Sequence, residues 1–205
     1  MPPAERRAIL LEAFAAAHAW HYPRNRAYRL TVSARGVGPT VDPAGPCSLA
    51  RLLRPTAQTF KSYVDLLGTP FAQDRPQAFL AWLADQLSIE LPAERFARFR
   101  PRYRSLEALL ADFERIYADL GLEALTSSGT SGRSTIMLRD QETLDKTTES
   151  FYLCFQRYFG MQAGHRAIFF MPQKTRIAMA RMAAFSVARV WAGDARIHFT
   201  IPFPA

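Results

Sequence analysis

Apolar residues recur at helical spacing along much of the first half of the chain. Between Pro3 and Trp20 they return every three or four positions, and the prolines at the start suit the first turn of a helix. A second helical pattern covers Gln77–Leu91. The intervening residues 22–58 are rich in proline, glycine and arginine, which predicts a long irregular connection with one strand at Tyr28–Ser33.

The pattern is sharper from Ser105 onward, where two amphipathic helices are expected. Ser105 carries a hydroxyl that can cap a helix start, and Gly121 suits the helix end. Asp140 and Gly160 bracket the second helix in the same way. The first apolar stripe consists of Leu106, Leu109, Leu110, Phe113, Ile116, Tyr117 and Leu120, and the second of Leu144, Thr147, Thr148, Phe151, Cys154, Phe155 and Tyr158.

Short runs of β-branched and aromatic residues predict strands in the second half. They are Thr135–Arg139, Ala167–Phe170 and Arg196–Ile201, with a further helix at Arg176–Ala192 that Gly193 ends. The order is therefore strand, loop, strand, helix, strand, helix, strand, which is the alternation of an α/β sheet with crossover helices. We expect a helical, Pro/Arg-rich region over 1–104 and an α/β domain over 105–205 that begins with a β-hairpin.

Charge and composition narrow the function classes. The formal net charge is +8, almost all of it from arginine, and 49% of the 205 residues are apolar. Solvated arginines on helix surfaces explain this charge better than a nucleic-acid groove, because no basic block alternates with exposed aromatics. No apolar run is long enough to span a membrane, and the N-terminus lacks the cleavage site of a signal peptide. Two distant cysteines suit the reduced state of a cytoplasmic protein.

Several residues that could carry chemistry have a simpler structural interpretation. His18 and His21 are expected to be surface histidines rather than a metal pair, because no acidic partner accompanies them. Cys154 lies in the predicted apolar stripe, where a buried, inert thiol is expected. The basic run 94–104 reads as a solvated helix edge, and Trp82 and the phenylalanines as core.

The stretch LTSSGTSGRSTIMLRD, residues 125–140, has the composition of an anion-binding loop. Glycines let successive backbone N–H groups converge on a phosphate, hydroxyls add donors, and an arginine adds charge. The candidate phosphate-binding residues are Ser127, Ser128, Gly129, Thr130, Ser131, Gly132 and Arg133. The loop matches neither the P-loop pattern nor the dinucleotide fingerprint. From composition alone, a phosphate loop and a plain hairpin turn remain equal alternatives.

The letters TSSGTSG at Thr126–Gly132, with a basic residue and a short apolar strand after them, resemble the phosphate loop of adenylate-forming enzymes. Together with Arg139 and Asp140 they look most like the acyl-protein synthetases of the LuxE type. Phenylacetate–CoA ligases, which carry SSGTTG, are similar as well. The resemblance is plainest over 105–160 and extends to 205.

This resemblance implies an activity, cofactors and partners. Such enzymes use ATP and Mg²⁺ to convert a carboxylic acid, here a fatty or other hydrophobic one, to an acyl-adenylate. The acyl group then passes to a thiol of coenzyme A, of a carrier protein or of an enzyme cysteine. The loop would hold the nucleotide phosphates, with Thr130 as the hydroxyl donor. No catalytic residue is identified.

The sequence also departs from the family pattern. Many relatives have a second threonine in place of Ser131 and Pro-Lys in place of Ser134-Thr135, so the lysine charge is absent. The later family motifs, including a metal-binding acid and a C-terminal lysine, are not visible. We therefore expect the N-terminal portion of a truncated or longer enzyme. One alternative is a non-catalytic nucleotide-binding module that needs a partner chain for the missing half, and another, less favoured, is a basic nucleic-acid-binding protein.

Overall fold

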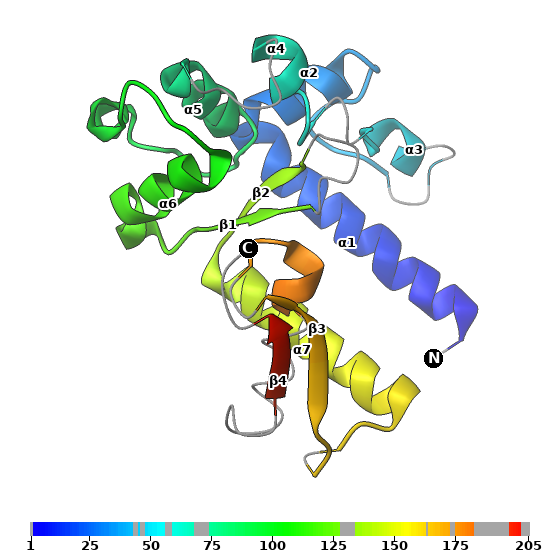
Figure 1. Ribbon diagram of the computed structural model, residues 1–205. Coiled ribbons are helices and arrows are strands. Elements are labelled where there is room, and N and C mark those ends of the chain that lie inside the picture. Colours follow the sequence, from blue (N-terminus) through cyan, green and yellow to red (C-terminus); the bar gives the residue numbers. More distant parts are fainter. Residues whose placement is uncertain are drawn as a thin grey trace. The chain divides into compact units, whose positions relative to one another are not determined.

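The fold is mixed α/β, mostly helical with two small sheets, which confirms the expected class at that level (Figure 1). The computed structural model describes residues 2–42, 45, 48–55, 59–67, 74–127, 134–162, 164–172, 175–182 and 197–201. The chain divides into two compact units, Met1–Leu109 and Leu110–Ala205.

The elements follow one another in a simple order, with helices first and strands later. The helices are α1 (Pro3–Arg24), α2 (Arg26–Ser33), α3 (Ser48–Leu52), α4 (Tyr63–Leu67), α5 (Pro76–Asp85), α6 (Leu106–Ile116) and α7 (Gln141–Phe159), with short 3-10 helices η2 (Ala93–Arg98) and η3 (Ala118–Leu120). The strands are β1 (Glu123–Thr126), β2 (Ile136–Arg139), β3 (Ala167–Pro172) and β4 (Ile197–Ile201).

The predicted first helix is confirmed as α1, the long blue helix of Figure 1. Its apolar stripe, however, is not buried as a helix face packed on a core would be. Ile9, Leu10 and Phe14 are 50%, 57% and 42% exposed. The buried side chain of α1 is instead His18, which is 1% exposed.

The strand expected at Tyr28–Ser33 is wrong, because these residues belong to helix α2. Asn25 explains the difference. Its side-chain oxygen accepts the Tyr28 N–H at 2.8 Å, which caps the helix, while its amide donates to the Gln86 carbonyl at 2.7 Å. Val32 is fully buried, in contact with Val37 and Leu52. A cap fixed from a distant segment therefore overrides the strand preference of the β-branched residues.

An aromatic cluster packs α4 against α5. The ring centroids of Tyr63, Phe79 and Trp82 lie 5.1–5.6 Å apart, and each of these residues is at most 5% exposed. The Trp82 indole N–H donates to the Ser62 hydroxyl at 2.8 Å, so its polar group is satisfied. The prediction that Trp82 belongs to the core is confirmed. Helix α5 ends at Asp85, earlier than the Leu91 predicted from its apolar pattern.

The basic run 94–104 has the solvated character that was expected. It begins in η2, and its arginines Arg98, Arg100, Arg102 and Arg104 are exposed. Arg102 pairs with Asp74 at 2.7 Å, with both side chains more than two-thirds exposed. Phe99 and Tyr103, between these arginines, are 5% and 2% exposed and anchor the run.

The predicted caps at Ser105, Asp140 and Gly160 are confirmed, whereas Gly121 ends the 3-10 helix η3 and not α6, which already ends at Ile116. The Ser105 hydroxyl accepts the Ala108 N–H at 3.2 Å at the start of α6. Gly121 and Gly160 have φ of +60° and +62°, the left-handed conformation that glycine adopts without strain. The stripe of α6 is buried as expected, with Leu109, Leu110 and Phe113 at 0% exposure.

The predicted hairpin is present in the second unit, but the described strands form two separate two-stranded sheets and not the single α/β sheet that the alternation indicated. β1 and β2 form an antiparallel hairpin with Leu125 opposite Met137, and β3 and β4 pair in parallel with Phe169 opposite Phe199. Ala167 of β3 is buried in contact with Phe155 of α7. Of the helix predicted at Arg176–Ala192, residues 178–182 are helical, whereas Arg176 and Ile177 precede the helix and Ile177 forms a β-bridge instead. Residues 183–192 and the predicted helix end at Gly193 lie outside the described residues.

Removing the Asp140 cap is expected to destabilise α7. Its carboxylate accepts the Thr143 N–H at 2.7 Å, and this bond holds the pKa of Asp140 below its usual value of 3.8. Asp140→Ala should lower the free energy of unfolding by about 1 kcal/mol at neutral pH, measured by urea unfolding. Because the folded-state pKa is depressed, this stabilisation is full above the unfolded value and is lost as the pH falls through the folded one.

Asp140→Asn is the matched control, since asparagine also caps helices but does not titrate. It should keep most of the stability and lose the acid dependence. Equal unfolding free energies for the wild type and Asp140→Ala at neutral pH would contradict the cap.

Candidate functional site

The candidate loop connects the two strands of the hairpin. Its first residue, Ser127, is hydrogen-bonded to Thr135 on the opposite side of the loop base. The Ser127 N–H donates to the Thr135 carbonyl at 3.0 Å, and the Ser127 hydroxyl accepts the Thr135 N–H at 2.8 Å. Ser127 and Thr135 therefore form a clasp beyond the last strand pair. Ser128, Gly129, Thr130, Ser131, Gly132 and Arg133 lie outside the described residues.

The clasp changes what Ser127 has available for a ligand. Its hydroxyl oxygen and its N–H are both used within the hairpin. A hydroxyl that accepts one hydrogen bond still has its own hydrogen to donate. Ser127 can therefore hold the loop base and contribute one donor to an anion at the same time.

The other edge of β1 is fixed by the segment that leads into residues 178–182. The Thr126 N–H donates to the Arg176 carbonyl at 2.7 Å, and Thr126 forms a parallel bridge with Ile177. Alternate residues of a strand direct their backbone polar groups to the same side, so Ala124 and Thr126 both face this segment rather than β2. The start of the loop is thus held from both edges of its strand.

An ion pair between Glu114 of α6 and Arg176 completes this arrangement. The guanidinium binds the carboxylate through two contacts of 2.5 and 2.8 Å, the two-point geometry that gives the strongest pairs. The Glu114 carboxylate also accepts the Ala124 N–H at 2.8 Å, and Arg176 donates to the Ala124 carbonyl at 3.2 Å. Both backbone groups of Ala124 are satisfied by this one pair of side chains.

The pair is shielded from water. The side chains of Arg176 and Glu114 are 13% and 27% exposed, and Ala124 is fully buried. A second pair, Arg181 with Glu123 at 2.5 Å, joins residues 178–182 to β1 with similar shielding. Two shielded ion pairs therefore lock the first strand of the hairpin to its neighbours, and this gives the loop a rigid base.

The described parts of the chain contain no cluster of metal-binding side chains. Among those residues, no group of three or more His, Cys, Asp or Glu side chains could hold a metal ion. Nor does any helix there combine the length and the apolar character that crossing a membrane requires.

Two expectations about reactive side chains are wrong. His18 is not a surface histidine, since it is 1% exposed and bonds to the Tyr28 hydroxyl and the Gly38 carbonyl, each at 2.8 Å. Cys154 is exposed on α7 rather than buried. His21 is on the surface as expected, and it bonds to the Ser88 hydroxyl at 2.6 Å.

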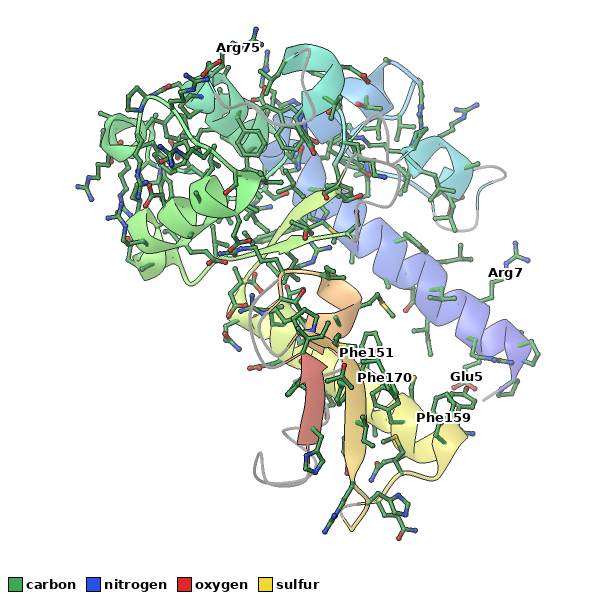
Figure 2. All side chains as sticks on the ribbon, in the orientation of Figure 1. Glu5, Arg7, Arg75, Phe151, Phe159 and Phe170 are labelled. Atoms are coloured by element: carbon green, nitrogen blue, oxygen red, sulfur yellow. The ribbon has the colours of Figure 1, made fainter. Side chains whose placement is uncertain are left out.

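Not all phenylalanines are core residues as was predicted. Figure 2 labels Phe159 near the end of α7 and Phe170 on β3, and these side chains are 72% and 83% exposed. Phe151, earlier on α7, does pack against the buried cluster of Leu125 and Leu144. The apolar stripe of α7 is therefore buried in its first half and exposed toward its end.

Comparisons with known proteins add no assignment. No family model matches the chain, and no curated protein or solved structure matches it either. The residues of the loop and its supports therefore carry the functional argument by themselves.

The supports of the loop were missed in the sequence. Glu114 lies within the polar face of an amphipathic helix, and Arg176 is one of many arginines. The two are 62 positions apart, so no local spacing links them. Their hydrogen bonds to Ala124 and Thr126, on the edge of β1 away from β2, make them neighbours of the loop.

Arg176→Met is expected to destabilise the hairpin strongly. The change leaves the shielded Glu114 carboxylate without its cation and the Ala124 carbonyl without that donor. We expect the free energy of unfolding to fall by about 3 kcal/mol, as measured by urea unfolding. The double variant Glu114→Leu with Arg176→Met should lose less than the two single losses added together, because the pair acts as one unit.

Lys146→Met is the matched control, because it removes a cation from an ion pair that is about three-quarters exposed. It should lower the free energy of unfolding far less than Arg176→Met does, because solvent screens an exposed pair. If Arg176→Met costs no more than this control, the ion pair does not support the hairpin.

Proposed function

We propose that this chain supplies the phosphate-binding loop of an adenylate-forming enzyme that activates a carboxylic acid with ATP. The observation that carries the proposal is the sequence TSSGTSGR on a clasped antiparallel hairpin. A plain hairpin turn needs only two to five residues, usually with glycine or asparagine. The segment beyond Ser127 is longer and is rich in glycines and hydroxyls, the donors that phosphate oxygens accept.

Within this proposal, the residues of the chain bind and orient the nucleotide. Backbone N–H groups at Gly129 and Gly132 would approach the phosphate oxygens, and the Thr130 and Ser131 hydroxyls would donate to them. Arg133 neutralises part of the negative charge. Fixing the pyrophosphate in place aligns the α-phosphate for attack by the substrate carboxylate, so that positioning and charge stabilisation supply the catalysis.

The backbone, hydroxyl and guanidinium donors of TSSGTSGR would suit a nucleoside triphosphate with its magnesium ion. Mg²⁺ is usually held by one or two carboxylates together with the substrate phosphates, so the protein needs no complete metal cage. When bound, the ion withdraws charge from the phosphates and helps pyrophosphate to leave. The loop residues of this chain would contact the phosphate oxygens that the ion leaves available.

The substrate and acceptor follow from the same proposal. The acid is a fatty or other hydrophobic carboxylic acid, and the acyl group is transferred from its adenylate to a thiol. Coenzyme A, a carrier protein or an enzyme cysteine can serve as that thiol. We place the reaction in the cytoplasm, where thiols stay reduced.

Bulky substitutions at the loop glycines test the proposal. Gly129→Val and Gly132→Val should weaken the binding of magnesium–ATP about 100-fold or more, because a side chain there displaces the phosphate from several N–H donors. Isothermal titration calorimetry measures the affinity, and circular dichroism reports whether the fold survives. Unchanged ATP affinity in both variants would refute the phosphate loop.

Gly164→Val is the matched control, since a side chain at Gly164 would meet no atom within 4 Å. It should bind ATP as the wild type does. Acid-dependent exchange between ATP and pyrophosphate then separates two outcomes. Exchange establishes adenylation, whereas ATP binding without exchange would indicate a nucleotide-binding module that needs a partner chain.

A further inference from the structure

Arg54, just beyond α3, has a buried donor that no described residue satisfies. Its Nε atom is shielded from solvent and makes no hydrogen bond. In the described part of the chain, no carboxylate forms an ion pair with its guanidinium. A buried donor without a partner is costly and rare in native proteins, so each one requires an explanation.

A second guanidinium lies beside it. Arg35, which follows α2, donates through one terminal nitrogen to the carbonyls of Arg51 and Leu53, with the Arg51 distance at 3.1 Å. These carbonyls belong to the end of α3, where a cation is favoured by the unpaired C=O groups. The remaining donors of Arg35 have no bond to other described residues. Because Leu53 directly precedes Arg54, two arginines with unused guanidinium donors are held close to the end of α3.

Among the described residues, no carboxylate acts on the charge of Arg54. Burial lowers the pKa of Arg54, the neighbouring Arg35 charge lowers it further, and the Tyr28 oxygen acts in the opposite direction. Burial in turn raises the pKa of Tyr28, so this phenol is neutral at physiological pH. The one group whose interaction with Arg54 is shown to favour its charge is therefore an uncharged hydroxyl.

The Tyr28 hydroxyl is also hydrogen-bonded to the buried His18. The Gly38 carbonyl can only accept, so His18 donates to it through Nε2. Nδ1 and the Tyr28 hydroxyl share the second bond, at 2.8 Å. The described donors at this place that have no partner are those of Arg35 and Arg54.

We propose that Arg35 and Arg54 together bind a small oxyanion, of the phosphate or carboxylate class. Guanidinium donors match the oxygen spacing of both groups in two-point contacts. One such anion satisfies the buried Nε and removes the repulsion between the two cations. The site lies wholly within residues of the unit Met1–Leu109 and does not depend on the proposed function of the loop.

The test observes Arg54 directly in the intact chain. The Nε–Hε resonances of ¹⁵N-labelled protein are recorded by nuclear magnetic resonance during titration with inorganic phosphate at constant ionic strength, and separately with sodium acetate. The Arg54 resonance is assigned by its absence in Arg54→Met. A saturable shift of this resonance with either anion supports the site, and the arm with the lower Kd identifies the class. No movement with phosphate or acetate overturns it.

A variant pair gives the second readout. Arg54→Met should weaken binding of the favoured anion about tenfold or more, the loss expected from one charge-assisted contact. Arg51→Met removes an equal charge from an exposed side chain on α3 and should change the affinity about twofold or less. Equal losses in both variants would mean a general charge effect and overturn the proposal.

Gly132→Val separates this site from the loop. It should leave the Arg54 shift intact even where ATP binding is lost. An Arg54 shift that disappears in Gly132→Val would place the anion at the loop and overturn the separate site. If the loop variants bind ATP normally while Arg54 still responds to phosphate, the proposed function fails and the oxyanion site stands.

Discussion

The hairpin depends on the ion pair between Glu114 and Arg176. A short strand such as β1 has unpaired backbone groups on the edge away from its partner, and buried groups of this kind must find other partners. The carboxylate and the guanidinium provide them at Ala124, while the backbone of Arg176 provides one at Thr126. The same pair therefore holds α6, β1 and the segment after β3 together, and the loop begins one residue beyond.

Local signals predicted the parts of this unit well. Ser105 and Asp140 each accept the N–H three residues on, and Gly160 ends α7 with positive φ, as their positions in the sequence suggested. Gly121 also has positive φ, but it ends η3 and not the helix that Ser105 begins. Capping and glycine conformation involve only neighbouring residues, so a sequence pattern contains the whole interaction. The strands β2, β3 and β4 were likewise visible as short β-branched and aromatic runs.

Interactions between distant residues were not predictable in this way. Helix α2 was mistaken for a strand because its cap, Asn25, is itself held by the carbonyl of Gln86, 61 positions away. The burial of His18 arises from Tyr28 and Gly38, neither of which a helical pattern indicates. The candidate loop shows both limits. Its donors were evident from composition, whereas the Ser127–Thr135 clasp and the ion pair that supports it required coordinates.

The arginine-rich composition has two structural outcomes in this chain, and they differ in how charge is compensated. Arg176 is shielded but bound at two points by a carboxylate, so its desolvation is offset and the pair acts as a structural support. Arg54 is partly buried beside a second cation, with a neutral phenol in place of a carboxylate. Removing a cation from water without a compensating partner costs free energy, so such a cation persists in a fold only where another interaction offsets that cost. An external anion can offset it, and for this reason the uncompensated arginines, rather than the much larger number of solvated or paired ones, indicate where the positive charge of the chain can bind a ligand.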